Sequence, residues 1–523
     1  MIITPINCEN KGIIEHLREM SLIFSVLFLD KEMIKFKTII TNSDTICYPM
    51  SPIISNQLHQ RLLLTAAAVG MFLDGLDGSI VTIILPQISE SFSTDTGTAS
   101  WVIITYLLMM AGLILIVGKV AERGQIRKIF LWGLCVFTAG SAACGIAPDL
   151  EILLTARIFQ GIGAAMLAST ASLLCVTYLP KDMYGLAFGA ISMSVSVGVA
   201  TGPAIGGFIA QYFSWHWAFL MNVPVGILIL AFAMHIIPPD IPREKQPFDL
   251  YGAILLFGLM AAGVYCLERI SHLGISDPQI LLCGSVSIAC LIAFYIRERM
   301  CNLPLIHISV FSVWNFTATL VAFLIYGCVS MGIFYLLPFF LQAGMTYNPA
   351  MAGLFLLIPP VITAIIGVPM GRWSDLIGRR PFAIAAAIFS IAVCGIFMTI
   401  VPENGFIPLV LGLLFMGLFM GCFGGPVASR VVENAPSGEE GTGTSLMVTA
   451  VYLGSVLGTA LFATFFTLGS VETGIAAFSD LDPEKFLRGF HLSMTAGFIL
   501  SVLALILSVI VREKKTQENT VRI

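Results

Sequence analysis

Long apolar runs separated by short polar loops fill the chain from about residue 62 onward. A helix that crosses a membrane needs about 20 apolar residues, and these runs approach or exceed that length. The pattern predicts fourteen spanning helices, six before a polar connector, two after it and six more toward the end. The expected helices cover residues 62–86, 98–118, 127–147, 151–178, 184–211, 216–236, 250–269, 279–297, 313–341, 350–371, 380–400, 405–430, 443–468 and 490–511.

The polar breaks divide the chain into five predicted parts. The first part has an apolar patch, Leu22–Leu29, which is too short to span a membrane, and Met50 offers an alternative first residue. The parts are a cytoplasmic, poorly ordered extension over 1–60, a six-helix bundle over 61–237, a connector with two inserted helices over 238–312, a second six-helix bundle over 313–511 and a cytoplasmic tail over 512–523.

The composition agrees with a membrane protein. Hydrophobic residues make up 57% of the chain and charged residues only 11%, and the mean hydropathy is +0.92. A soluble domain has about 25% charged residues. The 12 cysteines are scattered without a Cys-x-x-Cys pair, so they are expected to pack as small hydrophobes. We therefore expect an all-α polytopic protein in a lipid bilayer, with no cofactor, no metal site and no nucleic-acid partner.

Basic residues indicate which side of the membrane the loops face. Eighteen lie on the side of both termini and three on the opposite side, so both termini are expected in the cytoplasm. The eighteen are Arg61, Lys119, Arg123, Arg127, Lys128, Lys181, Arg243, Lys245, Arg297, Arg299, Arg372, Arg379, Arg380, Arg430, Arg512, Lys514, Lys515 and Arg522, and the three are Arg269, Lys485 and Arg488.

A charged loop occurs twice, after the second helix of each six-helix group. Gly118–Lys128 and Gly371–Arg380 are offset by 371 − 118 = 253 residues. The same offset carries Leu62 to about Asn315, near the start of the ninth expected helix. Two six-helix units in parallel orientation are typical of transporters whose halves rock against each other.

Small residues recur at helical spacing in the fifth expected helix. Gly198, Gly202 and Gly206 lie on one face, which predicts a tight helix–helix seam because close contact drives helix association in lipid. Pro203 removes a backbone donor within that seam, and Gly207 extends it. Simple packing is the alternative interpretation, since such faces are common in membrane helices.

This stretch resembles a known family. Gly198…Gly202-Pro203…Gly206-Gly207 and the following Trp215-x-Trp217-x-Phe219-x-x-Asn222-x-Pro224-x-Gly226 look like the antiporter motif and the fifth-to-sixth-helix turn of the fourteen-helix drug/proton antiporters of the major facilitator superfamily. His216 stands where that family often has Arg. The resemblance covers about residues 62–511 and implies the major facilitator fold, with two six-helix bundles plus two inserted helices.

The repeated loop resembles the superfamily's cytoplasmic signature, which implies a latch that opens as the halves rock. The first copy departs from the pattern, because Glu122 replaces the usual Asp and Gln125 takes a glycine position. A charged topology anchor is the alternative. The implied latch residues are Gly118, Glu122, Arg123, Gly371, Asp375 and Arg379.

Three ionisable residues lie inside spanning runs, Asp74 and Asp77 in the first and Arg157 in the fourth. A charge at the bilayer centre costs at least about 2.5–3.5 kcal/mol, so such residues are functional candidates. Asp77 and Arg157 match family motifs implicated in proton coupling, and Asp74 lies one helical turn from Asp77. Arginine stays charged and cannot carry the proton itself. The alternative is that one aspartate only pairs with Arg157 as a structural partner.

An aromatic, weakly polar stretch on the ninth expected helix also matches the family. Tyr335, Phe339 and Gln342, together with Gln160 beside Arg157, are predicted to line a substrate cavity suited to bulky lipophilic compounds. A packed helix face is the alternative.

Motifs of other chemistries are absent from the sequence. There is no Gly-x-x-x-x-Gly-Lys-Ser/Thr loop, no His-Glu-x-x-His and no Gly-x-Ser-x-Gly, so we expect neither ATP drive nor an enzyme. The resemblance implies a monomeric plasma-membrane exporter of lipophilic cations, exchanged for protons by alternating access. The alternatives are a proton-coupled exporter of one metabolite or amino acid, and a membrane sensor or assembly partner that transports nothing.

Overall fold

The computed structural model describes residues 54, 56–180, 183–240, 249–301, 306, 308–401, 405–436, 440–470 and 482–511. Most of the expected extension over 1–60, the tail over 512–523 and residues 241–248, 302–305 and 307 of the connector fall outside these residues. Fourteen helices of the described part are long and apolar enough to cross a membrane, as the sequence predicts. The described residues contain helices and no strand, which confirms the all-α polytopic fold.

The first half of the bundle contains six spans. They are α2 (Gln57–Ser91), α3 (Thr96–Ala121), α4 (Ile126–Gly145), α5 (Leu150–Tyr178), α6 (Tyr184–Tyr212) and the broken span of α7 (His216–Leu220) with α8 (Asn222–Ile236). The inserted pair follows as α9 (Leu250–Leu273) and α10 (Pro278–Met300).

The second half also contains six spans. They are α11 (Trp314–Phe339) with the π-helical turn Phe340–Gly344, α12 (Pro349–Leu356) with α13 (Ile358–Ile377), α14 (Arg380–Phe397), α15 (Phe406–Cys422) with a π-helical turn and α16 (Ala428–Asn434), α17 (Glu440–Ser470) and α18 (Pro483–Ile510). A short 3₁₀ helix, Ile308–Ser312, precedes α11.

Prolines explain where the expected helices are broken. Pro359 and Pro360 have no N–H to donate, and α12 gives way to α13 at Leu357, just before them. Pro426 lies in the π-helical turn Phe423–Val427 between α15 and α16. Each broken run still forms a single span, Pro349–Ile377 and Phe406–Asn434.

Capping residues extend two helices beyond the apolar runs. Asn56 accepts the backbone N–H groups of Leu58 and His59, so α2 begins before the expected residue 62. Asp482 caps α18 and is followed by Pro483, so the helix begins seven residues earlier than residue 490. The predicted outer-loop residues Lys485 and Arg488 therefore lie in the first turns of α18.

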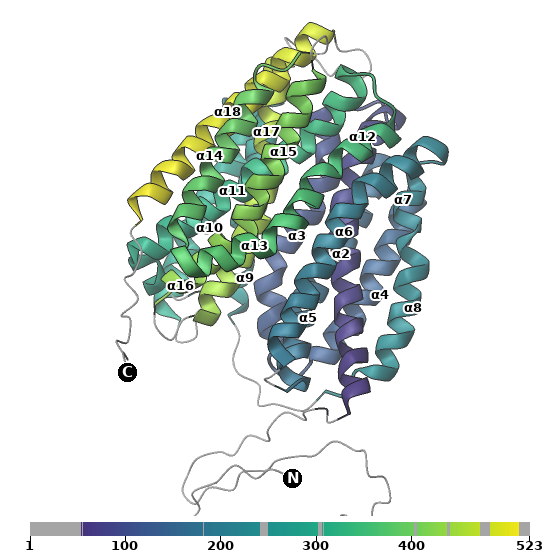
Figure 1. Cartoon of the computed structure of the whole chain (residues 1–523), viewed down its shortest axis with the longest axis vertical. Helices are drawn as coiled ribbons and strands as arrows, with labels where there is room; N and C mark the ends of the chain where they lie inside the picture. Colours follow the sequence, from purple (N-terminus) through teal and green to yellow (C-terminus); the bar gives the residue numbers. More distant parts are fainter. Residues whose placement is uncertain are drawn as a thin grey trace, which may run out of the picture.

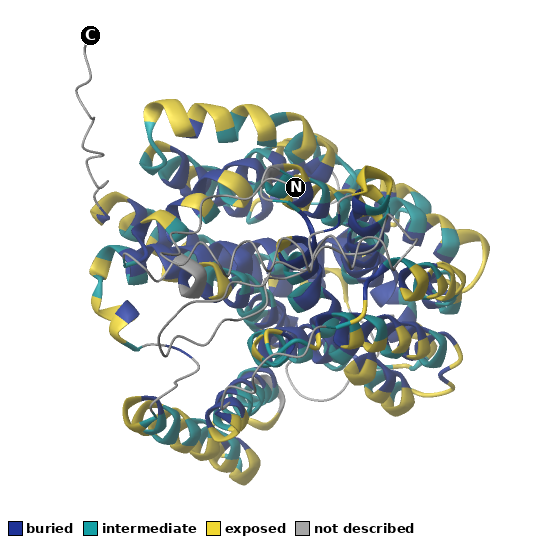
Figure 2. Cartoon of the chain, turned by 90° about the horizontal axis from the view of Figure 1, so that it is seen from below, coloured by how far each residue is buried: buried dark blue, intermediate teal, exposed yellow. Residues whose placement is uncertain are grey.

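The two halves meet mainly along two pairs of helices. Within the halves, α2 packs on α6 and α11 packs on α17; between them, α17 packs on α3 and α12 on α6. Figure 1 shows the helices of both halves running roughly alongside each other, with α12 beside the upper part of the first half. Figure 2 shows buried residues gathered in the interior and exposed residues mainly on the periphery. We call the side where α2 begins and α18 ends the terminal side, and the opposite one the far side.

Candidate functional site

A buried ion pair lies halfway along the first half of the bundle. Asp77 of α2 and Arg157 of α5 are 0% and 1% exposed, and one Arg157 guanidinium nitrogen lies 2.5 Å from Asp77 Oδ2. The two residues are 80 positions apart in the chain. The helix packing therefore brings together two of the three ionisable residues predicted from the sequence. Removing two charges from water is offset here by their mutual attraction and by further hydrogen bonds.

Amide side chains complete the shell of Asp77. Gln160 Nε2 donates to Asp77 Oδ1 at 2.7 Å, and Asn222 Nδ2 donates to the same oxygen at 3.0 Å. Gln160 Nε2 also donates to Ser141 Oγ, while its Oε1 accepts from Arg157 at 2.7 Å. Gln160 is fully buried in this cluster, so the structure places this predicted cavity residue within the charged site.

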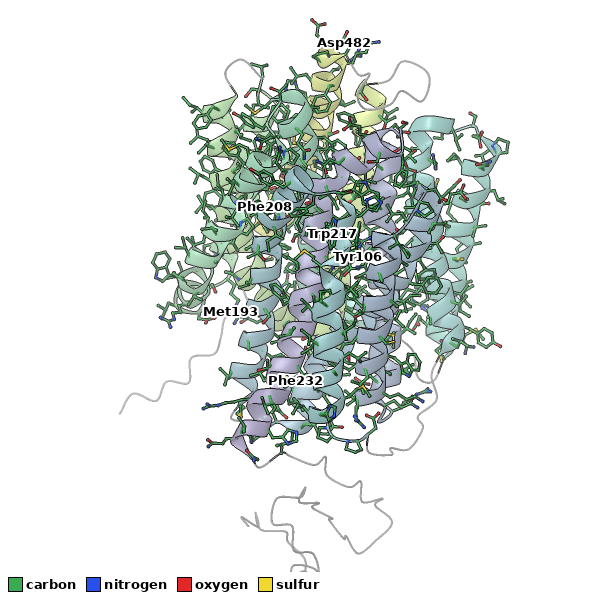
Figure 3. All side chains as sticks on the ribbon, turned by 90° about the vertical axis from the view of Figure 1, so that its right-hand side faces the viewer. Tyr106, Met193, Phe208, Trp217, Phe232 and Asp482 are labelled. Atoms are coloured by element: carbon green, nitrogen blue, oxygen red, sulfur yellow. The ribbon has the colours of Figure 1, made fainter. Side chains whose placement is uncertain are left out.

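The guanidinium of Arg157 is also held on its other sides. Its Nε donates to the carbonyl of Val102 at 2.9 Å. Its central carbon lies 4.2 Å from the centroid of the Tyr106 ring and 5.7 Å from that of Phe219. A cation over an aromatic face is stabilised by the ring quadrupole, and more so when desolvated. Figure 3 labels Tyr106 about midway along the height of the bundle.

Asp74 makes a second, separate set of contacts. It is 5% exposed, and its Oδ1 accepts the hydroxyl of Tyr106 at 2.6 Å. Its Oδ2 accepts the hydroxyl of Tyr452 at 3.3 Å, from α17 of the other half. Tyr106 therefore lies between Asp74 and Arg157. The three predicted ionisable residues form one connected site with two carboxyl groups and a single guanidinium.

The predicted aromatic residues lie between the halves, on the far side. Tyr335 and Phe339 are fully buried with ring centroids 5.8 Å apart, and the Tyr335 hydroxyl donates to Thr96 O at 2.6 Å. Gln342 donates to the carbonyl of Ile83 at 2.9 Å. Gln342 also lines a cavity of about 300 Å³ with Pro86, Gln87, Glu90, Ala343, Tyr347 and Pro349.

The glycine seam packs α6 directly on α2. A Cβ atom on Gly198 would lie 2.6 Å from Phe72 O, and one on Gly202 would lie 2.9 Å from Ile80 N. A Cβ on Gly206 would lie 2.6 Å from a side-chain carbon of Ile80. The backbones therefore approach as closely as the glycine spacing predicts.

The rest of the seam faces the other half. A Cβ on Gly207 would collide with the carbonyl of Pro349, and one on Gly353 would collide with the carbonyl of Pro203. These contacts join α6 to α12 on the far side. Gly207 and Pro203 thus belong to the junction between the halves, while Gly198, Gly202 and Gly206 face α2.

The two copies of the charged loop differ in their ion pairs. In the first, Lys119 Nζ lies 3.6 Å from Glu122 Oε2, and both side chains are half exposed. In the second, Arg379 lies 3.4 Å from Asp375 and 3.1 Å from Glu433 of α16. The second copy therefore joins three helices, α13, α14 and α16.

A glycine turns the chain in each loop. Gly124 has φ +85° and Gly378 has φ +92°, a region that favours glycine. In the first loop the turning glycine is Gly124, one residue before Gln125, which stands at the glycine position of the family pattern. Asp240, after α8, accepts the backbone N–H groups of Arg127 and Lys128 at 2.7 and 2.9 Å, which caps α4 from outside its own sequence.

Sequence reasoning missed several residues of these sites, including Ser141 and Glu433. Tyr106 and Tyr452 carry polar tips within apolar runs, which is the signal that could have marked them. Asn222 belongs to a motif quoted for the resemblance, without an assigned contact. Asp240 lies in the polar connector, and its spacing in the sequence does not show that it caps α4, more than 110 positions away.

A fourteen-helix bundle around a buried charged cluster defines a multi-pass membrane protein of the transporter class. The family model described as "Major Facilitator Superfamily" matches residues 67–459. The chain therefore belongs to the major facilitator superfamily, among relatives of the multidrug efflux type, and it is a transporter and not an enzyme.

Two kinds of relative stand out by name. The riboflavin transporter RibZ of Clostridioides difficile (strain 630) is 28% identical over 407 residues, which cover 77% of this chain and 88% of that protein. A putative multidrug resistance protein MdtD of Klebsiella pneumoniae (strain 342) is 29% identical over 404 residues, which cover 77% and 85%. The two relatives are thus named for different substrates, although their sequence identities to this chain are similar.

Solved structures share the fold at low identity. A bacterial homolog of the human lysosomal transporter Spinster superposes with a TM-score of 0.63 at 15% identity, covering 87% of this chain and 97% of that one. A D-xylose–proton symporter gives 0.59 at 14% identity, covering 86% and 96%. These similarities support the major facilitator fold.

Proposed function

We propose that this protein exports lipophilic cations in exchange for protons by alternating access. The observation that carries the proposal is the pair of buried carboxyl groups, Asp74 and Asp77, beside the single guanidinium of Arg157. When both carboxyl groups are ionised, the three side chains carry one surplus negative charge. A bound proton or a bound organic cation would each balance that charge, and a charge left unbalanced at this depth is costly.

In the proposed cycle, the terminal side is cytoplasmic, in keeping with the distribution of basic residues. With the site open to the cytoplasm and both carboxyl groups ionised, a cation binds and the halves rock. On the far side, a proton binds one of the two carboxyl groups, balances the surplus charge and displaces the cation. Arg157 stays charged throughout and biases where the proton is held.

The remaining predicted residues have roles in this cycle. The aromatic stretch of Tyr335 and Phe339 parts as the far side opens, and Gln342 already borders a cavity there. The seam limits leakage because close helix contact leaves no water path. The Asp375–Arg379–Glu433 cluster serves as the terminal-side latch of the second half.

Transport in proteoliposomes tests the proposal. Purified protein is reconstituted with a pH-sensitive dye inside, and lipophilic cations are added to wild type and to Asp77→Asn. Wild type should move protons on addition of a cation, and the variant should not. Cation transport without proton movement by the wild type would contradict the exchange.

A second candidate is an exporter of one metabolite, favoured by the relative named as a riboflavin transporter. A panel of cationic dyes, amino acids and riboflavin on the same vesicles separates the two. Proton movement restricted to one neutral or zwitterionic compound would favour the second candidate.

A further inference from the structure

The contact between Asp74 and Tyr452 joins the charged site of the first half to the second half. Asp74 lies near the middle of α2, and Tyr452 lies near the middle of α17. The hydroxyl of Tyr452 donates to Asp74 Oδ2 at 3.3 Å. The two residues are 378 positions apart in the chain, in the first and the thirteenth spans.

The second half fixes the position of Tyr452. On α17, Gly454 and Gly458 pack on the α11 backbone, since a Cβ on Gly454 would clash with Leu324 O and one on Gly458 with Cys328 O. Residues two apart on a helix point in nearly opposite directions, at about 200°. Tyr452 is therefore directed away from α11, toward the first half.

The charged and titratable groups around Asp74 come from several helices. Asp77 lies one turn away on α2, Tyr106 comes from α3, Arg157 comes from α5 and stacks on the Tyr106 ring, and Tyr452 comes from α17. α6 packs on α2 at this level through the Val195 backbone, which lies against Gly75. Both phenols donate to the carboxylate, an arrangement that suits an ionised acid.

Ionisation of Asp74 thus sets the strength of the contact between the halves. A hydrogen bond to a charged acceptor is about twice as strong as one to a neutral acceptor. A proton on Asp74 removes the charge and turns one acceptor oxygen into a donor. A cation bound beside Asp74 balances the same negative charge and so weakens its hydrogen bond with Tyr452.

Three other contacts between the halves lie on the far side and would break as that side opens. Tyr335 donates to Thr96 O, Gln342 donates to Ile83 O, and Gly353 lies against Pro203, all on the far side. For the far side to open, these contacts and the Asp74–Tyr452 bond have to separate together.

We propose that Tyr452 is a positioning residue for coupling: bonded to ionised Asp74, it holds the empty transporter closed on the far side until a proton or a cation balances the charge. This inference rests on the proposed proton exchange. An exchanger whose empty form reorients freely lets protons through without substrate. Tyr452 therefore acts against proton leak, while the substrate-bound and protonated forms stay free to reorient.

Proton leak in proteoliposomes without substrate tests this role. Tyr452→Phe keeps the ring and removes the hydroxyl, and its leak under an imposed pH gradient should exceed that of wild type by about tenfold. Tyr326→Phe is the matched control, because the Tyr326 hydroxyl bonds to Ala383 O and Ser508 within the second half. A wild-type leak in Tyr452→Phe, with its substrate-driven proton flux intact, would overturn the inference and leave the proposed function standing.

A conformational measurement separates failure of the inference from failure of the proposed function. Hydrogen exchange in the far-side ends of α6 and α12 is compared between wild type and Tyr452→Phe at the same pH. The variant should exchange faster than wild type at about pH 8, and Tyr452→Phe should add nothing in an Asp74→Asn background, where the charge is already absent. Equal exchange of wild type and Tyr452→Phe would overturn the inference even in a protein that exchanges no protons. The proposed function itself fails if wild type shows no substrate-driven proton flux.

Discussion

At the scale of single residues, Asp77 is held from several sides. It accepts three hydrogen bonds, from Arg157, Gln160 and Asn222, in a site that excludes water. Breaking a buried ion pair by removing one partner is costly, because the remaining charge loses its compensation. Any cycle that protonates Asp77 therefore has to give the charged Arg157 another partner.

Asp77→Asn should leave the protein in the membrane and abolish proton-linked efflux. The amide keeps the size of the side chain but holds neither charge nor an exchangeable acid proton. We expect a fall in substrate-driven proton flux of at least about tenfold, the scale set by one charged hydrogen bond. Asp277→Asn is the matched control, since Asp277 is a cap residue in the loop before α10 and asparagine also caps. Undiminished dye efflux by Asp77→Asn would refute the coupling role.

The acid and the arginine could be predicted from the sequence, and their partners could not. Ionisable residues within an apolar run are rare, so Asp74, Asp77 and Arg157 can be recognised from the sequence without knowledge of the fold. Tyr452 lies 378 residues from Asp74, and only the packing of α17 against the first half brings them together. Periodicity determines the face of one helix and not which helix opposes it.

At the scale of helices, the seam between α2 and α6 relies on missing side chains. Gly202 should tolerate no larger residue, because its Cβ would collide with Ser79 and approach Ile80 N at 2.9 Å. We expect Gly202→Leu to reduce the yield of folded protein strongly, since overpacking costs about 1–3 kcal/mol or more. Gly189→Leu, on the same helix, has open space at its Cβ and should express normally. The yield of monodisperse protein after detergent extraction is compared between the two variants. Equal yields would refute the tight seam.

The start of the inserted helix α9 has a pH-dependent cap. Asp249 accepts Gly252 N–H at 3.0 Å and Arg297 Nε at 3.1 Å. Burial acts to raise the pKa of Asp249, but these donors outweigh it and hold that pKa below its ordinary value. Because the folded-state pKa lies below the unfolded one, the contribution to stability is present above about pH 4 and is lost as the pH falls through the folded value.

Asp249→Asn should therefore melt at a lower temperature than wild type near neutral pH, since asparagine can cap the helix but cannot pair with Arg297. The difference should shrink as the pH falls below about 4 and through the folded-state pKa, where the wild-type acid also becomes neutral. Thermal unfolding of both proteins in the same detergent measures it. A difference that stays constant with pH would show that the charge contributes nothing.

Apolar runs predicted the spans well and their ends less well. Each expected run coincides with a described span, because a membrane-crossing helix needs a minimum apolar length. The early start of α18 depends on Asp482 and Pro483, polar residues outside the run. The substrate cavity stays a prediction; in this structure Tyr335 and Phe339 are buried between the halves and Gln160 is buried in the charged site.

At the scale of the whole molecule, we expect close contacts within one half to hold that half together and those between the halves to open and close during transport. Gly353 lies against the carbonyl of Pro203 across the junction of α12 and α6. Gly353→Leu should leave each half intact, because the added side chain points at the other half. We expect near-normal yield with transport reduced at least about tenfold, since the far side can no longer close. Gly367→Leu on α13, with open space at its Cβ, should transport normally.

If Gly353→Leu transports as well as wild type, the α6–α12 contact takes no part in closure. A loss of yield equal to that of Gly202→Leu would show instead that the contact is needed for folding. The pair of substitutions thus distinguishes a seam that holds one half together from a junction that opens and closes.

Proton release on binding tests the central claim most directly. Purified protein in weakly buffered detergent is mixed with a lipophilic cation that it transports, and the pH change is measured with an indicator dye. Because proton and cation compete for one surplus charge, about one proton should be released per cation bound, and affinity should fall up to tenfold per pH unit on acidification. Asp74→Asn and Asp77→Asn should each reduce the release. Tight binding without proton release by the wild type would contradict the account.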